Sequence, residues 1–137
     1  MLKLNKILFE IVGNLNEEIS AREAYSDGNA IQTVIDGKRD VCWISWSPIA
    51  QSKIEKPENH LSYLDVPYNP ANQIIVYRND IDGAEERAKE LLKIAKKYGG
   101  YLAWDATEED SRRIGELLSY KKEDIDAYIN RTGDYKP

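Results

Sequence analysis

Cysteine and histidine are scarce in this sequence, with one of each among 137 residues. The single cysteine, Cys42, excludes an internal disulfide, and with His60 it cannot supply the three or four nitrogen and sulfur ligands of a zinc site. By count alone the two residues could form a nucleophilic pair. Cys42 lies in the middle of a predicted strand rather than at a helix N-terminus, however, so we expect a buried and unreactive thiol.

Long apolar runs and phosphate-binding motifs are missing. No run is long enough to span a membrane, and Glu10 interrupts the apolar N-terminal segment, which does not resemble a secretory signal. The patterns GxGxxG and GK[ST] are absent. A stretch resembling a calcium loop, around Asp80 and Asp82, has Arg78 and Lys89 where the end carboxylates should stand. We therefore expect a cytoplasmic protein without a bound cofactor or metal.

A basic surplus is also missing, because the formal net charge is −5. Binding to nucleic acid needs a basic face that neutralises phosphates, so such binding is not expected. Residues 101–137 hold more acidic than basic side chains. An acidic mimic of nucleic acid is therefore one alternative, against the more common explanation of a solvated helix face.

Tyrosine and tryptophan dominate the aromatic residues, with nine Tyr and three Trp against one Phe. Both side chains combine an apolar body with a polar group and are favoured at contact surfaces. This bias indicates a surface that meets a partner.

The first half of the chain alternates apolar runs with turn residues. Residues 2–12 are expected to form a strand, and Asn16 to cap a helix that ends near Gly28. Residues 30–35 and 41–46 flank the segment DGKRD, and an Asp-Gly between β-branched runs predicts a hairpin. Residues 47–71 contain four of the five prolines and are expected to be an irregular insert that adds little to the core, with a short edge strand at 61–66.

The second half gives clearer signals. Residues 73–77 predict a buried strand, and a helix follows whose apolar stripe includes Ala84, Ala88 and Leu91. We expect Asp82 to cap this helix. A strand at 101–104 would complete a βαβ unit with two parallel strands. Two further helices are expected at 107–118, capped by Thr107 or Asp105, and at 123–130 with Ile125, Tyr128 and Ile129 facing inward.

These elements predict a single α+β domain over residues 1–137. Its mixed sheet would carry ferredoxin-like βαββαβ elements, the irregular insert at 47–71 and two extra C-terminal helices. A small doubly wound α/β fold is the alternative.

Two regions are candidate binding sites. In the first, a cleft lies between strand 41–46 and the insert, with aromatic and polar side chains as its lining: Trp43, Trp46, His60, Tyr63, Asp65 and Tyr68. The second is the corner where a strand ends at Trp104 and Asp105. The segment DATEED at this corner repels anions, so only a neutral or cationic partner fits it.

The absence of a catalytic pair and of a metal cluster favours a cytoplasmic binding or regulatory protein. It would present its Tyr/Trp and acidic surface to another protein or to a second copy of itself. A small-molecule-binding protein or enzyme, using the cleft, is the first alternative. The acidic mimic is the second.

Overall fold

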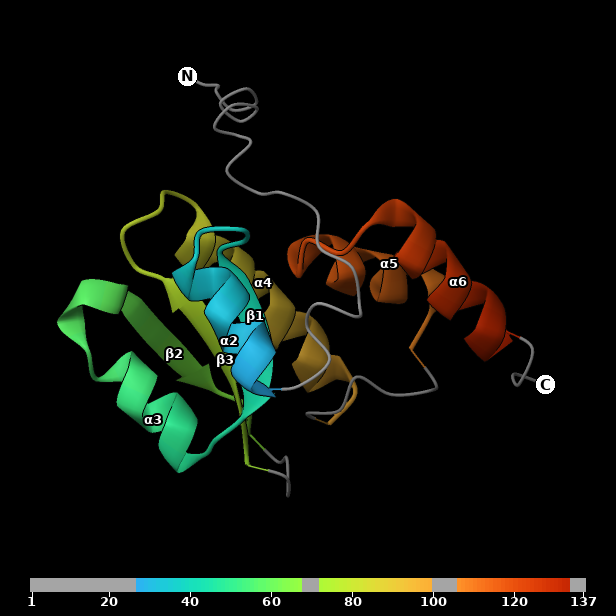
Figure 1. Cartoon of the computed structure of the whole chain (residues 1–137). Helices are drawn as coiled ribbons and strands as arrows, with labels where there is room; N and C mark the ends of the chain where they lie inside the picture. The colour runs from blue at the N-terminus through green and yellow to red at the C-terminus, as the bar shows by residue number, and fades with distance from the viewer. Residues whose placement is uncertain (1–26, 68–71, 100–105, 134–137) are drawn as a thin grey trace.

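The computed structural model describes residues 27–67, 72–99 and 106–133 (Figure 1). The predicted strands at 2–12 and 101–104 and the start of the helix after Asn16 lie outside these residues. The predicted end of that helix near Gly28 is wrong, because Gly28 lies at the beginning of a helix that runs on to Ile35. The described helices are α2 (Asp27–Ile35), α3 (Pro48–Ile54), a single 3-10 turn (Pro57–Asn59), α4 (Ala84–Lys97), α5 (Glu108–Leu117) and α6 (Lys122–Gly133). The described strands are β1 (Val41–Ser45), β2 (Leu61–Asp65) and β3 (Gln73–Arg78).

The three strands form an antiparallel sheet in the order β1-β3-β2. β3 lies in the centre, and its residues 74–77 are all buried, as the apolar run at 73–77 predicts. Helix α4 covers one face of the sheet, and α2 and α3 cover the other (Figure 1). A central strand covered on both faces needs apolar side chains at consecutive positions, which is why this segment shows no alternation.

Helices α5 and α6 extend the layer that begins with α4. Thr107 caps α5, since its side chain accepts a hydrogen bond from the Asp110 backbone N–H. Ile125 and Ile129 of α6 are buried as expected, whereas Tyr128 is 38% exposed, so its predicted inward position is wrong. Gly115 lets α6 approach α5 closely, because a Cβ there would lie 2.6 Å from Ile125 Cγ1.

Residues 30–35 are helical, so the predicted hairpin is wrong. Ala30, Ile31 and Val34 lie on one side of α2 and pack on the sheet. Spacings of one and four residues suit a helix face, although the β-branched content favoured a strand. The Asp36–Gly37 pair ends this helix instead of forming a hairpin turn, with Gly37 at φ 80°.

The insert at 47–71 is more regular than predicted. It contains α3, the 3-10 turn and β2, and β2 is the edge strand expected near 61–66. The expectation that the insert adds little to the core is wrong, because Ala50, Leu61 and Val66 are buried. Their spacing shows no single period, because Ala50 lies in α3, Leu61 begins β2 and Val66 directly follows β2.

The α+β class is confirmed. The ferredoxin-like order is not, because it counted residues 30–35 as a strand and the helix there breaks that order. The predicted cap of α4 is also wrong: Gly83 holds the N-cap position at φ 85°, with no side-chain hydrogen bond to the helix end.

Candidate functional site

The two tryptophans of the predicted cleft lie on opposite faces of the sheet. Trp43 packs on the α4 side, where its indole N–H donates to Gln73 Oε1 at 2.6 Å. Trp46, just after β1, packs on the side of α2 and α3. The two side chains therefore do not line one cleft.

Trp46 and Tyr63 do come together, with ring centroids 5.3 Å apart. Tyr63 is 40% exposed and Ile49, on α3, is 63% exposed. We call Trp46, Ile49 and Tyr63 the aromatic surface. His60 and Asp65 are both exposed and stand at opposite ends of β2. The remaining candidates, Tyr68, Trp104 and Asp105, lie outside the described residues.

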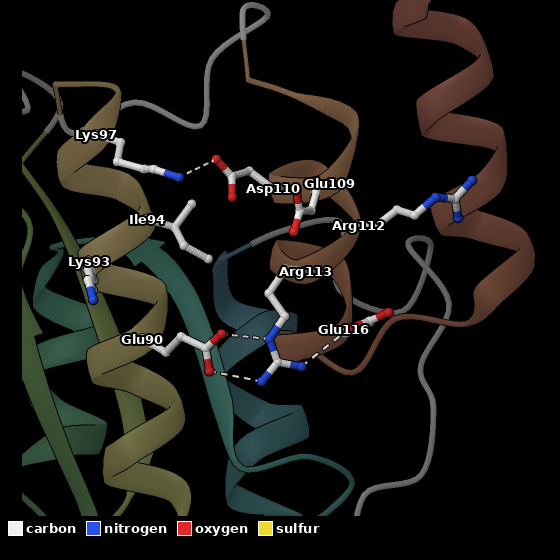
Figure 2. A pocket seen from close by; sticks show the side chains of 9 residues that line it. All are labelled: Glu90, Lys93, Ile94, Lys97, Glu109, Asp110, Arg112, Arg113 and Glu116. Carbon is white, nitrogen blue, oxygen red and sulfur yellow. Dashed lines mark hydrogen bonds and ion pairs between the residues drawn. The ribbon is translucent and has the colours of Figure 1, made fainter.

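A groove of about 640 Å³ runs between α4 and α5 (Figure 2). Ion pairs cross it at two points. Arg113 donates two hydrogen bonds to the Glu90 carboxylate, at 2.6 and 2.8 Å, and Lys97 donates to Asp110 at 2.8 Å. These ion pairs hold α4 against α5. They explain the charged side chains of the groove without a ligand.

A second hollow, of about 410 Å³, lies among α4, α5 and α6 and shares Arg112 and Glu116 with the groove, and we call it the Tyr120 pocket. Its size is within the range of small-molecule sites, roughly 300–1,000 Å³. Side chains from α4, α5, the following turn and α6 line it: Arg87, Arg112, Glu116, Ser119, Tyr120, Lys122 and Ile125. The lining thus contains three cationic side chains, one carboxylate and two large apolar side chains.

Asp40 and Arg87 form an ion pair that reaches from the protein interior to this pocket. Asp40 is fully buried, and Arg87, which lines the pocket, donates from Nη2 to Asp40 Oδ2. Burial, more than the charge of Arg113, lowers the pKa of Arg87 from its ordinary value.

This buried pair is incompletely satisfied. Asp40 Oδ1 and Arg87 Nε are both buried and without a hydrogen-bond partner among the described residues. Buried polar atoms are nearly always paired, because an unmade hydrogen bond costs about 1–3 kcal/mol. The pair therefore keeps one spare acceptor and one spare donor in the protein interior.

Arg39, the neighbour of Asp40, is fully buried and well satisfied. Its guanidinium donates to Thr33 Oγ1 at 2.8 Å and to the Leu118 carbonyl at 2.9 Å. The same group lies 5.6 Å from the centre of the Tyr120 ring, within cation–π range. Arg39 thus connects α2 to the end of α5, and its guanidinium contacts the Tyr120 ring that lines the pocket.

The turn between α5 and α6 adopts an uncommon backbone conformation at the pocket. Ser119 has φ 63°, in the left-handed region that a residue with a Cβ rarely occupies. A left-handed residue directly after the C-cap is a common way for a helix to end, and the Ser119 N–H donates to the Glu116 carbonyl as this motif requires. Here the fixed Leu118 carbonyl precedes Ser119, and the Tyr120 N–H donates to the Gly115 carbonyl.

Sequence reasoning missed the Tyr120 pocket and its charges. One signal was available, since Arg87 occupies the apolar stripe of α4, three residues after Ala84 and four before Leu91. An arginine at a core-facing position indicates a buried partner. Nothing local links Arg87 to Asp40, 47 positions earlier.

Within the three described segments, no group of three or more His, Cys, Asp or Glu residues is placed to hold a metal ion. None of the helices in these segments combines the length and the apolar character needed to cross a membrane.

Comparison with known proteins gives a structural similarity. No family model matches the sequence, and no curated protein matches it. The crystal structure of the bacterial cysteine methyltransferase effector NleE is similar, with a TM-score of 0.70 and 22% sequence identity. The similarity covers 97% of this chain and 77% of that one. The chain therefore shares its fold with that bacterial protein.

Proposed function

We propose that this protein transfers a methyl group to a cysteine side chain of a partner protein. The observation that carries the proposal is the similarity to a cysteine methyltransferase, which extends over 97% of the chain and leaves almost no part of the fold unmatched. A fold can host several functions, so the chemistry of the site must be compatible as well.

The charges around the Tyr120 pocket suit a thiol substrate. The thiolate is the nucleophilic form of cysteine, and nearby cations lower the pKa of a thiol. Arg87, Arg112 and Lys122 would do so for a cysteine entering this pocket, with Arg112 and Lys122 also paired with Asp126. The Glu116 carboxylate, which pairs with Arg113 at 3.3 Å, would accept the thiol proton by releasing that pair. The protein's own Cys42 is fully buried, which favours direct transfer without a methylated enzyme cysteine.

Methyl transfer also requires a donor. S-adenosylmethionine, the usual biological donor, supplies a methyl group on a positively charged sulfur with a good thioether leaving group. In the transfer, the partner's sulfur forms a bond to the methyl carbon while the bond from that carbon to the donor's sulfur breaks. The Ser119 side chain and the Tyr120 ring, which both line the pocket, suit a donor with polar and aromatic groups.

The partner protein needs a surface on which to dock. The aromatic surface of Trp46, Ile49 and Tyr63 is the best candidate among the described residues, since exposed aromatic and large apolar side chains mark interfaces. A cytoplasmic location accords with this function, because cysteine thiols stay reduced there.

Binding of the donor gives the first test. Isothermal titration of the full chain with S-adenosylmethionine and with S-adenosylhomocysteine should show one site, and both ligands should raise the melting temperature. No binding of either ligand at millimolar concentration would refute the proposal.

Transfer itself is tested with a labelled donor and a cell extract. Addition of the chain should raise the incorporation of label above that of the extract alone, which contains methyltransferases of its own. Prior alkylation of the extract's thiols with iodoacetamide should abolish this increase, and an increase that persists after alkylation would show a different acceptor.

A protein-binding role without catalysis is the second candidate, and the exposure of Ile49 and Tyr63 favours it. Under this alternative the double variant Ile49→Ser/Tyr63→Ser would lose its partner, and the wild-type chain would bind no methyl donor.

A further inference from the structure

Strand β2 directs main-chain groups away from the sheet along its outer edge. It pairs with β3 on one side, and among the described residues no strand pairs with it on the other (Figure 1). At the two ends of the pairing, the His60 carbonyl accepts from the Asn79 N–H at 2.8 Å, and the Val66 N–H donates to the Gln73 carbonyl at 3.1 Å. Alternate residues of an antiparallel strand point their N–H and C=O groups to opposite sides. The even-numbered residues of β2 therefore bond to β3, and the odd-numbered residues direct these groups to the outer edge.

This edge has none of the usual protection against pairing. Tyr63 and Asp65, two of the odd-numbered residues, are both exposed. Natural edge strands commonly prevent association with a lysine, a proline or a bulge. The sequence of β2, LSYLD, contains neither lysine nor proline, and its register with β3 continues without a bulge. The edge is therefore suited to pair with another strand.

A second copy of β2 is complementary to this edge. In an antiparallel pair centred on Tyr63, the two Tyr63 residues face each other, and Leu61 of each copy faces Asp65 of the other. Asp65 is the single charged residue of β2, so this arrangement places no like charges opposite each other. A two-fold axis generates such a pair, and two-fold dimers are the commonest protein assemblies.

The aromatic side chains favour the same arrangement. The Tyr63 ring is 5.3 Å from the Trp46 ring, and Tyr63 remains 40% exposed. Side chains directly opposite in an antiparallel pair have Cβ atoms about 4.5–5.5 Å apart, which is close enough for two tyrosine rings to touch. Trp46 and Tyr63 of both copies would then form one cluster across the two-fold axis, and exposed aromatic surface would be removed from water.

We propose that the chain forms a symmetric dimer by antiparallel pairing of two β2 edges, which joins the two sheets into one. The aromatic surfaces of the two copies then lie side by side, so that a partner protein meets both. The inference is independent of the proposed methyl transfer, because no residue of β2 lines the Tyr120 pocket.

The mass of the full chain in solution is the first test. Sedimentation equilibrium between about 1 μM and 1 mM should show a mass that rises from the 15.7 kDa of one chain towards twice that value. A chain that stays monomeric at the highest concentration would overturn the inference, and donor binding would still be measurable on that monomer.

A matched pair of variants then locates the interface. Tyr63→Lys places two like charges opposite each other and should raise the dimer dissociation constant about tenfold or more. Tyr128→Lys makes the same change on α6, at a tyrosine of similar exposure, 38% against 40%, and should leave the constant unchanged. Circular dichroism melts establish that both variants are folded. An unchanged constant in folded Tyr63→Lys would assign the dimer to another surface and overturn the inference.

Amide exchange on the wild-type chain gives a test that needs no variant. The Tyr63 N–H points to the outer edge and should exchange more slowly as the protein concentration rises. The Leu64 N–H is expected to bond to β3 already and should change much less. A Tyr63 amide that exchanges at the same rate at every concentration would overturn the inference. If that amide is already protected in the monomer, another segment of the chain covers the edge and the second copy is excluded.

Discussion

Two consecutive residues, Arg39 and Asp40, are both fully buried and differ in how they are satisfied. Arg39 donates to three acceptors and has a structural role, because it joins α2 to the end of α5. Asp40 has one paired and one unpaired oxygen. A buried carboxylate left half-satisfied is costly to the fold, so Asp40 contributes less to stability than Arg39 does.

The contact between Gly115 and Ile125 gives a prediction for one residue. Gly115→Ala would place a methyl group 2.6 Å from Ile125 Cγ1 and 2.9 Å from its Cδ1. Overpacking costs about 1–3 kcal/mol, and the gain in helix propensity is only about 1 kcal/mol. We expect a net loss of unfolding free energy in urea titrations.

Gly28→Ala is the control, because a Cβ there meets no atom within 4 Å. It should leave the midpoint unchanged or raise it. In the Gly115→Ala background, Ile125→Ala should cost less than in the wild type, since it removes the clashing atoms. Additive losses would contradict this packing.

Cys42 gives a second prediction at this scale. Its side chain is fully buried in β1, so reaction with Ellman's reagent should be slow in the native protein and fast in denaturant. Fast labelling of the native protein would show that the thiol is accessible and would reopen the possibility that it is a nucleophile.

At the scale of elements, charged pairs join α4 to α5. Asp110 accepts hydrogen bonds from Lys97 Nζ at 2.8 Å and from the Tyr98 hydroxyl at 2.6 Å, and Glu90 pairs with Arg113 (Figure 2). Lys97, more than Tyr98, lowers the pKa of Asp110, and Arg113 lowers the pKa of Glu90. The two helices therefore depend on ionised carboxylates for part of their contact.

The direction of these pKa shifts fixes the pH dependence. A carboxylate with a folded pKa below its unfolded value stabilises the protein above the unfolded pKa, and this contribution is lost as pH falls through the folded value. For Asp110, with an ordinary pKa of 3.8, the loss should begin as the pH falls toward 3.8 and continue below it. Urea midpoints of Asp110→Asn should fall less steeply over this range than those of the wild type, and parallel curves would contradict the assignment.

At the scale of the whole molecule, the sheet is built from distant segments. β2, in the insert, pairs with β3 over five residues, and Ala50, Leu61 and Val66 fill the core around it. The aromatic surface lies on this insert and on the end of β1, whereas the Tyr120 pocket lies among α4, α5 and α6. A partner docked on one and a ligand bound in the other would therefore contact different elements.

Replacing residues 47–71 by a short glycine-rich loop should abolish folding. The change removes an edge strand and three buried side chains, and each large apolar residue lost from a core costs about 2–5 kcal/mol. The measurement is a urea melt followed by circular dichroism. Ile49→Ser, which alters only an exposed side chain of the same segment, should melt like the wild type. A cooperative melt of the deletion variant would show that the insert is dispensable.

The sequence by itself determined the elements whose signals are local. The apolar run at 73–77, the stripe of α4 and the Thr107 cap all depend on residues within a few positions of each other, and each is observed. The buried state of Cys42 followed from its place in an apolar strand. Length and pattern also sufficed for the α+β class.

Only the tertiary structure decided between helix and strand at 30–35, because the same apolar residues fit both periods and packing on the sheet selects the helix. It also brought together Asp40 and Arg87, which are far apart in the chain. A pairing between distant charges leaves no local pattern, since its energy arises only when folding removes both groups from water. For that reason the candidate site could not be found from the sequence, although the helix that carries Arg87 could.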